Sequence, residues 1–294
     1  MILITGLSGT SGSAFYDILC RERYPEKIRV ITRGYKNCAI FDNSPLDIEV
    51  VNGDISDVDF LVDTMRGCDK VFHIANKEKS EAVAEAICRS PQIRYAIMVS
   101  STIIYSKYHP NSKLNKIEPS IKERFQRQGI KYVFIRPTMI FGTPTDSNIS
   151  TFIRWFRKYP VFPIVKNGSA TIRPVSRLDL AEAYWMILKN IQNLSRNEYI
   201  VSGKDEMTLL EMFRIITDVL DHKVRFVNIP FSLAKFLVNS LYFATLKKID
   251  YREKLDRLTE DRAYSHDDIK REFGFEPLSF RERVTPLIRQ IQSE

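Results

Sequence analysis

The chain has 294 residues, of which 44% are hydrophobic and 27% charged, and its formal net charge is +8. These are ordinary values for a globular protein with a full core, and they exclude a disordered chain, a collagen-like repeat and a disulfide scaffold. The charge suits an anionic partner, but no long basic run indicates a nucleic-acid-binding protein, and the scattered cysteines and histidines predict no metal site.

The first half of the chain alternates strands and helices. Apolar, β-branched runs predict strands at 2–5, 28–32, 48–51, 70–74, 95–100 and 132–136. Helices are expected between them: from the glycine-rich stretch to about 22, after a cap at Ser56, over 80–89 and over 113–128. This alternation predicts an α/β fold, with a parallel sheet covered by helices on both faces.

The second half follows another pattern, with helices expected at 149–159, 178–190, 208–220 and 231–246, and before Gly274. Short strands are expected at 198–201 and 224–227. We therefore predict a dinucleotide-binding domain over 1–147 and a smaller α+β substrate-binding region over 148–294, packed on it with interleaving elements. The apolar helix 231–246 fits either a core-facing helix or a substrate lid or shallow membrane contact.

The most informative stretch runs from Thr5 to Gly12 and reads TGLSGTSG. Gly6, Gly9 and Gly12 follow a strand and open a helix, which is the context that a dinucleotide-binding loop requires. Residues without a Cβ allow a tight turn and a close approach of the backbone to a pyrophosphate, while the helix N-terminus offers free N–H groups. The stretch therefore predicts a Rossmann-type doubly wound sheet that binds NAD or NADP.

The end of the second strand bears on the choice of cofactor. An acidic residue there would bind the ribose 2′-hydroxyl of NAD, whereas an arginine would accommodate the 2′-phosphate of NADP. This chain has Thr32-Arg33-Gly34 and no acid at that point. Arg33 therefore favours NADP over NAD. The alternative is that Arg33 is an ordinary solvated arginine at the end of a strand.

Several further motifs accompany the glycine loop: Gly53-Asp54, the segment 69–75 (DKVFHIA), the segment 99–105 (VSSTIIY), the segment 136–142 (RPTMIFG) and the segment 175–181 (VSRLDLA). Together they resemble the extended short-chain dehydrogenase/reductases, and most of all the NAD-dependent epimerase/dehydratase family that acts on nucleotide sugars. The resemblance covers nearly the whole chain and does not identify the substrate.

The resemblance also implies roles for individual residues. By it, Gly6, Gly9 and Gly12 with Thr10 and Ser11 hold the pyrophosphate, Asp54 and Ile55 lie beside the adenine, and Ala75 passes near the ribose. Ser101 falls where the family has its catalytic serine or threonine. Arg173 and Arg177 lie near an arginine that binds the diphosphate of the substrate, although solvated arginines are equally consistent with the pattern.

One family feature is absent, the Tyr-x-x-x-Lys pair that exchanges a proton with the substrate. None of the 13 tyrosines has a lysine four residues later. Counting back from Arg136-Pro137 places the pair at Leu114 and Glu118, or at Ser112 and Lys116 after a shift of two residues. Tyr105 or Tyr108 could supply a phenol instead, and Lys113 or Lys116 could supply the positive charge beside it. Ser101, Tyr105 and Lys116 are therefore the expected catalytic residues.

Three functions fit these observations. The first is an NAD(P)-dependent reductase or epimerase that acts on a nucleotide sugar by hydride transfer, which the resemblance associates with surface-polysaccharide synthesis. The second is an NADP-binding sensor or assembly protein without catalysis, and the third is a reductase of a lipid-like substrate. The chain opens directly on a strand without a signal peptide, so a cytoplasmic protein is expected, with a homodimer left open.

Overall fold

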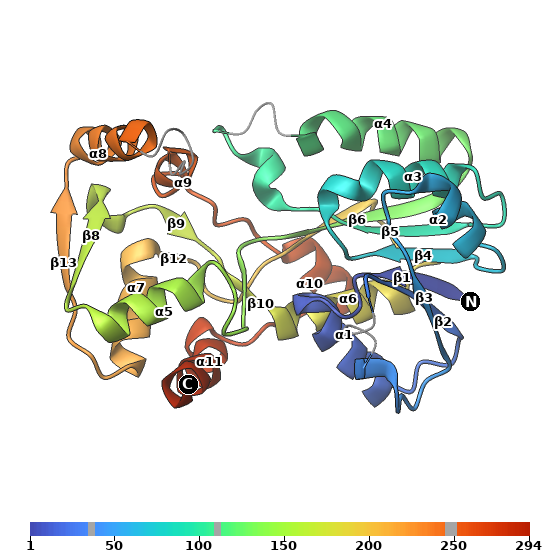
Figure 1. Ribbon diagram of the computed structural model, residues 1–294, viewed down its shortest axis with the longest axis horizontal. Helices are drawn as coiled ribbons and strands as arrows, with labels where there is room; N and C mark the ends of the chain where they lie inside the picture. The colour runs from blue at the N-terminus through green and yellow to red at the C-terminus, as the bar shows by residue number, and fades with distance from the viewer. Residues whose placement is uncertain (35–38, 109–112, 245–251) are drawn as a thin grey trace.

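The computed structural model describes residues 1–34, 39–108, 113–244 and 252–294. A seven-stranded parallel sheet forms the larger body, in the order β11-β6-β5-β4-β1-β2-β3 (Figure 1). Its strands are β1 (Ile2–Thr5), β2 (Ile28–Thr32), β3 (Ile48–Asn52), β4 (Lys70–His73), β5 (Tyr95–Val99), β6 (Lys131–Pro137) and β11 (Glu198–Val201). The order reverses direction between β1 and β4, which confirms the predicted doubly wound fold.

Helices cover both faces of this sheet (Figure 1). One face carries α2 (Val58–Thr64), α3 (Ser80–Cys88) and α4 (Lys113–Arg127), and the other carries α1 (Thr10–Arg21) and α6 (Arg177–Lys189). Leu3 and Ile4 are neighbours on β1 and both are fully buried, Leu3 in the core under α2 to α4 and Ile4 in the core under α1 and α6. This double burial is why the strands are apolar throughout rather than alternating.

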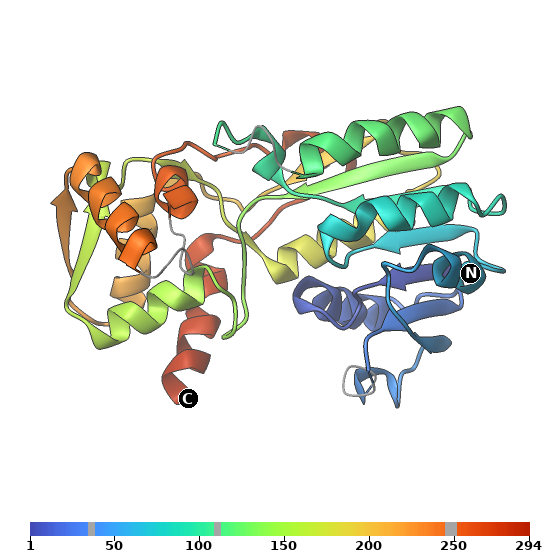
Figure 2. The same ribbon diagram turned by 45° about the horizontal axis from the view of Figure 1, so that its top comes forward.

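The smaller body has its own core among α5 (Ile149–Lys158), α7 (Leu209–Val219) and α11 (Phe280–Ser293), as the left half of Figure 2 shows. Three two-stranded ladders frame it. They pair β7 (Ile140–Phe141) with β10 (Val175–Ser176), β8 (Val161–Val165) with β13 (Arg225–Ile229), and β9 (Thr171–Ile172) with β12 (Met207–Thr208). Beyond residue 147, α6, β11 and α10 (Asp267–Phe273) return to the larger body, so the chain crosses between the two bodies repeatedly.

Two local expectations were wrong. The cap of α2 is Asp57, whose carboxylate accepts a hydrogen bond from the Phe60 N–H at 3.1 Å, whereas the Ser56 N–H donates to Asp54. Helix α11 was missed, although its capping box of Ser279 and Glu282 was readable in the sequence. The corresponding box at Thr208 was recognised and opens α7 as expected.

Helix α8 (Phe231–Ala244) is buried on one side and exposed on another, and its expected end at 245–246 lies outside the described residues. Ala234 is 4% exposed and packs with Val165 and Leu255. On another side Phe236 and Leu237 are 66% and 52% exposed. Among the described residues no helix has both the length and the apolar character needed to span a membrane.

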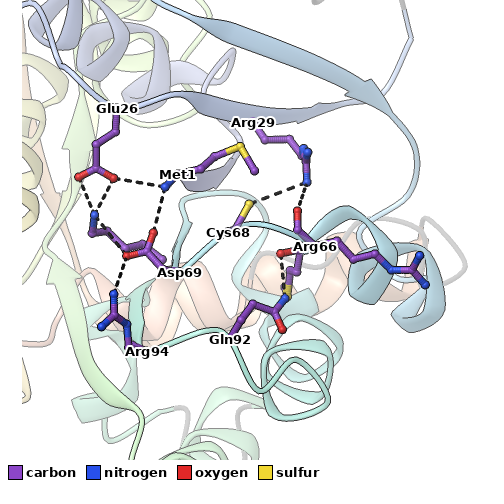
Figure 3. A network of polar contacts seen from close by, with 10 residues as sticks. Met1, Glu26, Arg29, Arg66, Cys68, Asp69, Gln92 and Arg94 are labelled. Carbon is purple, nitrogen blue, oxygen red and sulfur yellow. Dashed lines mark hydrogen bonds and ion pairs between the residues drawn. The ribbon is translucent and has the colours of Figure 1, made fainter.

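A polar network lies at the amino-terminal ends of β1, β2 and β4 (Figure 3). The Met1 amino nitrogen lies 3.0 Å from Asp69 Oδ1, and Lys70 Nζ lies 2.6 Å from Glu26 Oε1. The Arg29 guanidinium donates to the backbone carbonyl of Arg66 nearby. These charges join the starts of β1, β2 and β4.

His73 ends β4 fully buried, with Nδ1 2.7 Å from the Thr5 hydroxyl at the end of β1. Burial lowers the pKa of His73 to about 4. Between pH 6.5 and 4 the unfolded chain therefore binds a proton that the native state excludes, so stability falls as the pH falls through this window, by about 3 kcal/mol in all.

Urea unfolding at a series of pH values measures this loss. His73→Gln removes the titrating group, so its stability is expected to depend less steeply on pH than that of the unmodified protein across the window. Equal slopes for the two proteins would contradict the buried neutral imidazole.

Candidate functional site

A cleft of about 590 Å³ opens at the carboxyl ends of β1, β4 and β5, where the strand order reverses. Parallel sheets bind ligands at this point because the loops that follow neighbouring strands diverge to opposite faces. Its lining combines segments far apart in the sequence. They are Gly6, Ser8–Ser11, Ile31–Arg33, Asp54, Ile55, Ile74–Lys77, Lys79, Val99–Ser101, Pro137, Thr138, Ile140 and Tyr184.

The glycine loop forms one wall of this cleft. Gly6 has a φ of +80°, and a Cβ there would lie 2.6 Å from the Ala75 backbone nitrogen, so the turn after β1 meets the turn after β4 with no room for a side chain. Gly9 precedes α1, and no side chain caps this helix. The first N–H groups of α1, next to Thr10 and Ser11, therefore keep their hydrogen-bonding capacity for an anion in the cleft.

Gly12 is not on the surface of the cleft but sits behind the loop. A Cβ there would lie 2.0 Å from the Gly6 carbonyl oxygen, so α1 packs directly on the end of β1. Gly6, Gly9, Thr10 and Ser11 thus line the cleft, whereas Gly12, which was also expected at the pyrophosphate, does not line it and permits the packing that shapes it.

The residues expected at the adenosine end also line the cleft. Arg33 is exposed after β2, and Asp54 and Ile55 follow β3. The Ser56 N–H donates to the Asp54 carboxylate at 2.8 Å and lowers its pKa, and the charges of Lys79 and Arg33 lower it further. The cations Arg33 and Lys79 and the carboxylate of Asp54 therefore lie at the same end of the cleft. This combination suits a ribose with or without a phosphate.

Of the expected catalytic residues, only Ser101 lines the cleft. Its hydroxyl accepts a hydrogen bond from the Ile103 N–H at 3.3 Å, which fixes it at the end of β5. The ring of Tyr105 packs instead against Tyr264, with centroids 5.4 Å apart, and burial raises the pKa of its phenol. Lys116 is exposed on α4. Tyr105 and Lys116 are thus not brought to Ser101 in this structure.

The positions of the family's tyrosine and lysine are filled differently. Leu114 is buried in the core between α4 and the sheet, and Ser112 lies outside the described residues. Glu118 is buried and forms an ion pair with Arg136, with 2.8 Å between Oε2 and Nη1. Glu118 also accepts a hydrogen bond from the Ser100 hydroxyl on the cleft wall. By the count without a shift, a carboxylate paired with an arginine therefore stands at the position expected for the family's lysine, whereas the count shifted by two places Lys116 there.

Neither of the two arginines expected at the substrate is among the residues that line the cleft. The Arg177 guanidinium donates to the Gly142 carbonyl at 3.2 Å and to the Ser13 hydroxyl at 3.1 Å, so it ties α6 to the start of α1. Arg173 is half-buried, and its backbone carbonyl accepts a hydrogen bond from the Thr138 hydroxyl. Arg177 thus supports the phosphate loop from behind.

Sequence reasoning missed several lining residues, namely Ser100, Lys77, Lys79, Thr138 and Tyr184. Tyr184 comes from α6, and its hydroxyl lies 3.4 Å from the Ser11 hydroxyl under the phosphate loop. No local signal marks it, because its place depends on the packing of α6 against α1. Lys77 and Lys79 follow shortly after the expected ribose residue Ala75. Their position after β4 could have predicted that they line the cleft.

The comparisons with known proteins agree with this geometry. The model of the NmrA-like family matches residues 1–268. Subunit 9 of the NADH dehydrogenase (ubiquinone) 1 alpha subcomplex, from Arabidopsis thaliana mitochondria, is 27% identical over 144 residues. That stretch is 46% of this chain, and it spans only 36% of the length of the subunit.

Solved structures match the whole chain. DesIV from Streptomyces venezuelae, a dTDP-glucose 4,6-dehydratase with NAD bound, is 20% identical with a TM-score of 0.73, over 100% of this chain and 97% of that chain. UDP-glucuronic acid 4-epimerase from Bacillus cereus, in complex with UDP-glucuronic acid and NAD, is 14% identical with a TM-score of 0.70, over 99% of both chains. These likenesses confirm the epimerase/dehydratase-type fold that the sequence resembles.

Proposed function

This chain belongs to the NmrA-like family, and from that premise we propose that it is an NADP-dependent enzyme that transfers hydride to a sugar carbon of a nucleotide sugar. One observation carries the proposal: the glycine loop and Ser101 share a single cleft at the switch point of the sheet. The loop fits the pyrophosphate of a dinucleotide, and Ser101 lies further along the same cleft. The structural neighbour solved with NAD and UDP-glucuronic acid supports this substrate class. The proposal includes a role in surface-polysaccharide synthesis, which rests on the family resemblance of the sequence alone.

Different residues of the cleft have different roles in this proposal. The N–H groups at the start of α1 bind the phosphates, and Arg33 with Asp54 holds the adenosine ribose. The Ser101 hydroxyl donates a hydrogen bond to the sugar oxygen, which favours the charge that develops on it. The bound dinucleotide supplies or accepts the hydride.

Arg33→Ala tests the preference for NADP. The substitution is expected to weaken NADPH binding by about 10- to 100-fold and NADH binding by less than about twofold, since a hydrogen bond to a charged group contributes about 1.5–3 kcal/mol. Titrations of nucleotide fluorescence measure both affinities. Arg66→Ala, an exposed arginine outside the cleft, is the matched control. An equal loss for both nucleotides would remove the assignment.

A second candidate is a dinucleotide-binding sensor or assembly protein that does not catalyse. The burial of Leu114 and the pairing of Glu118 with Arg136 favour it, because the proton-transfer pair of the family is absent from its usual positions. The NADH dehydrogenase relative, a subunit of a larger assembly by its name, agrees with this candidate. The lipid-like substrate has less support, since among the described residues none that lines the cleft comes from α8.

Turnover separates the two candidates. Purified protein is mixed with NADPH and a 4-keto-6-deoxy nucleotide sugar, and the absorbance of the reduced nicotinamide is followed. Ser101→Ala is expected to slow the reaction by about 100-fold, in line with the loss of one donor to a developing oxyanion, while Ser120→Ala on the exposed face of α4 leaves it unchanged. Tight NADPH binding without any turnover would favour the sensor.

A further inference from the structure

The cleft holds few groups that could exchange a proton with a substrate. Its ionisable lining residues are Arg33, Asp54, Lys77, Lys79 and Tyr184. Tyr184 is fully buried beside the phosphate loop, which raises the pKa of its phenol. Arg33 and Lys79 both act electrostatically on Asp54 at the adenosine end. Lys77 is the remaining ionisable group among these described residues.

Lys77 lines the same cleft as Ser100 and Ser101. The turn that carries Lys77 packs against α4, whose Glu118 carboxylate accepts a hydrogen bond from Ser100. The charges of Glu118 and of Arg257 on α9 (Arg252–Arg257) act on the Lys77 ammonium. Lys77 therefore lies beside α4 in the cleft that Ser100 and Ser101 line.

The backbone that carries Lys77 is fixed. A short helical turn, Lys77–Lys79, follows β4 directly, and Asn76 caps it by accepting a hydrogen bond from the Glu78 N–H at 3.0 Å. The turn packs against α3 and α4. The half-buried side chain is therefore held at the cleft by rigid elements rather than by a long loop.

The surroundings also make this ammonium a better proton donor than an ordinary lysine. Burial lowers the pKa of Lys77, and the Arg257 charge lowers it further, against the attraction of Glu78 and Glu118. General acids work best when their pKa approaches the working pH. The family's phenol is tuned by a neighbouring lysine, whereas here a lysine is tuned by burial and a neighbouring arginine.

We propose that Lys77 is the proton donor of this cleft and occupies the role that a tyrosine has in the related enzymes. The proposal rests on the proposed hydride transfer. In reduction, the keto carbon of the sugar gains a hydride from the reduced nicotinamide, which leaves oxidised. The keto oxygen gains a proton from the Lys77 ammonium, so a hydroxyl forms, and the neutral amine regains its proton from water.

Lys77→Ala tests the assignment. It is expected to lower turnover with a 4-keto nucleotide sugar by about 100- to 10,000-fold, the usual contribution of a general acid, with NADPH affinity changed by less than about threefold. Added ethylamine is expected to restore part of the rate, and a purely structural lysine would give no such rescue. Lys189→Ala, exposed at the end of α6, is the matched control.

A second measurement does not depend on turnover. Competitive acetylation of the unmodified protein over a range of pH, read by mass spectrometry, reports the reactivity of each lysine. Lys77 is expected to reach its full reactivity at a lower pH than Lys189 and to be protected by NADPH. If the reactivity of Lys77 does not rise at lower pH than that of Lys189, or if Lys77→Ala turns over at the full rate, the assignment of Lys77 is overturned. The proposed hydride transfer is not affected by either result. Absence of turnover in the unmodified protein would instead overturn the proposed function, and the proton-donor role with it.

Discussion

Replacing Arg136 by methionine is expected to lower the free energy of unfolding by about 3–5 kcal/mol, the cost of breaking a buried ion pair. The side chains of Arg136 and Glu118 are 1% and 5% exposed, and Arg136 also reaches Glu198 at 3.1 Å. The substitution leaves the Glu118 carboxylate in the interior without its ion-pair partner, although it still accepts a hydrogen bond from Ser100. Urea unfolding measures the loss.

A double substitution shows whether the cost comes from the stranded charge. Glu118→Leu combined with Arg136→Met removes both charges, and it is expected to recover much of the stability, because two apolar groups of similar volume leave neither member of the buried ion pair stranded. The exposed pair of Arg127 and Glu123 is the comparison, since Arg127→Met is expected to cost less than about 1 kcal/mol. A cost at Arg136 no larger than that at Arg127 would contradict the buried pair.

Replacing Gly12 by alanine is expected to weaken NADPH binding by about 10- to 100-fold and to destabilise the fold by about 1–3 kcal/mol. The new methyl group would lie 2.0 Å from the Gly6 carbonyl oxygen and 2.8 Å from Leu7 Cα. Both obstacles are backbone, so α1 must move away from β1. That movement displaces the N–H groups that would bind the phosphates. Fluorescence titration and urea unfolding measure the two effects.

Gly9→Ala is the graded control for this prediction. Its φ is −80°, and its Cβ would meet only the Gly6 carbonyl oxygen, at 3.1 Å, which a small shift relieves. We therefore expect a loss of affinity below about fivefold and little change in stability. If the two variants lose the same affinity, crowding at the phosphates explains the loss, and the packing of α1 on β1 does not.

The candidate site was only partly readable in the sequence. The residues expected at the cofactor directly follow β1, β2, β3 and β4, and a parallel sheet brings the carboxyl ends of its strands to one edge. The position of a residue just after a strand was therefore enough to predict that Arg33, Asp54 and Ala75 line the cleft. Tyr105 is only four residues beyond Ser101, yet its ring packs against Tyr264 from a distant segment. Glu260 fixes this loop by accepting hydrogen bonds from Ser106 and the Lys107 N–H, a contact that no local pattern shows.

The sequence by itself determined the alternation of strands and helices, the glycine loop and the ends of several helices. These depend on short-range physics: apolar runs for buried strands, Gly6 for a positive φ, and the capping box at Thr208. The tertiary structure alone decided that β11 joins the sheet beside β6 and that Glu118 pairs with Arg136. It also decided that Lys77, rather than Lys116, faces the cleft. Those outcomes depend on how the two bodies pack and on the free energy of burying charged groups. Both are determined only when segments far apart in the sequence come together.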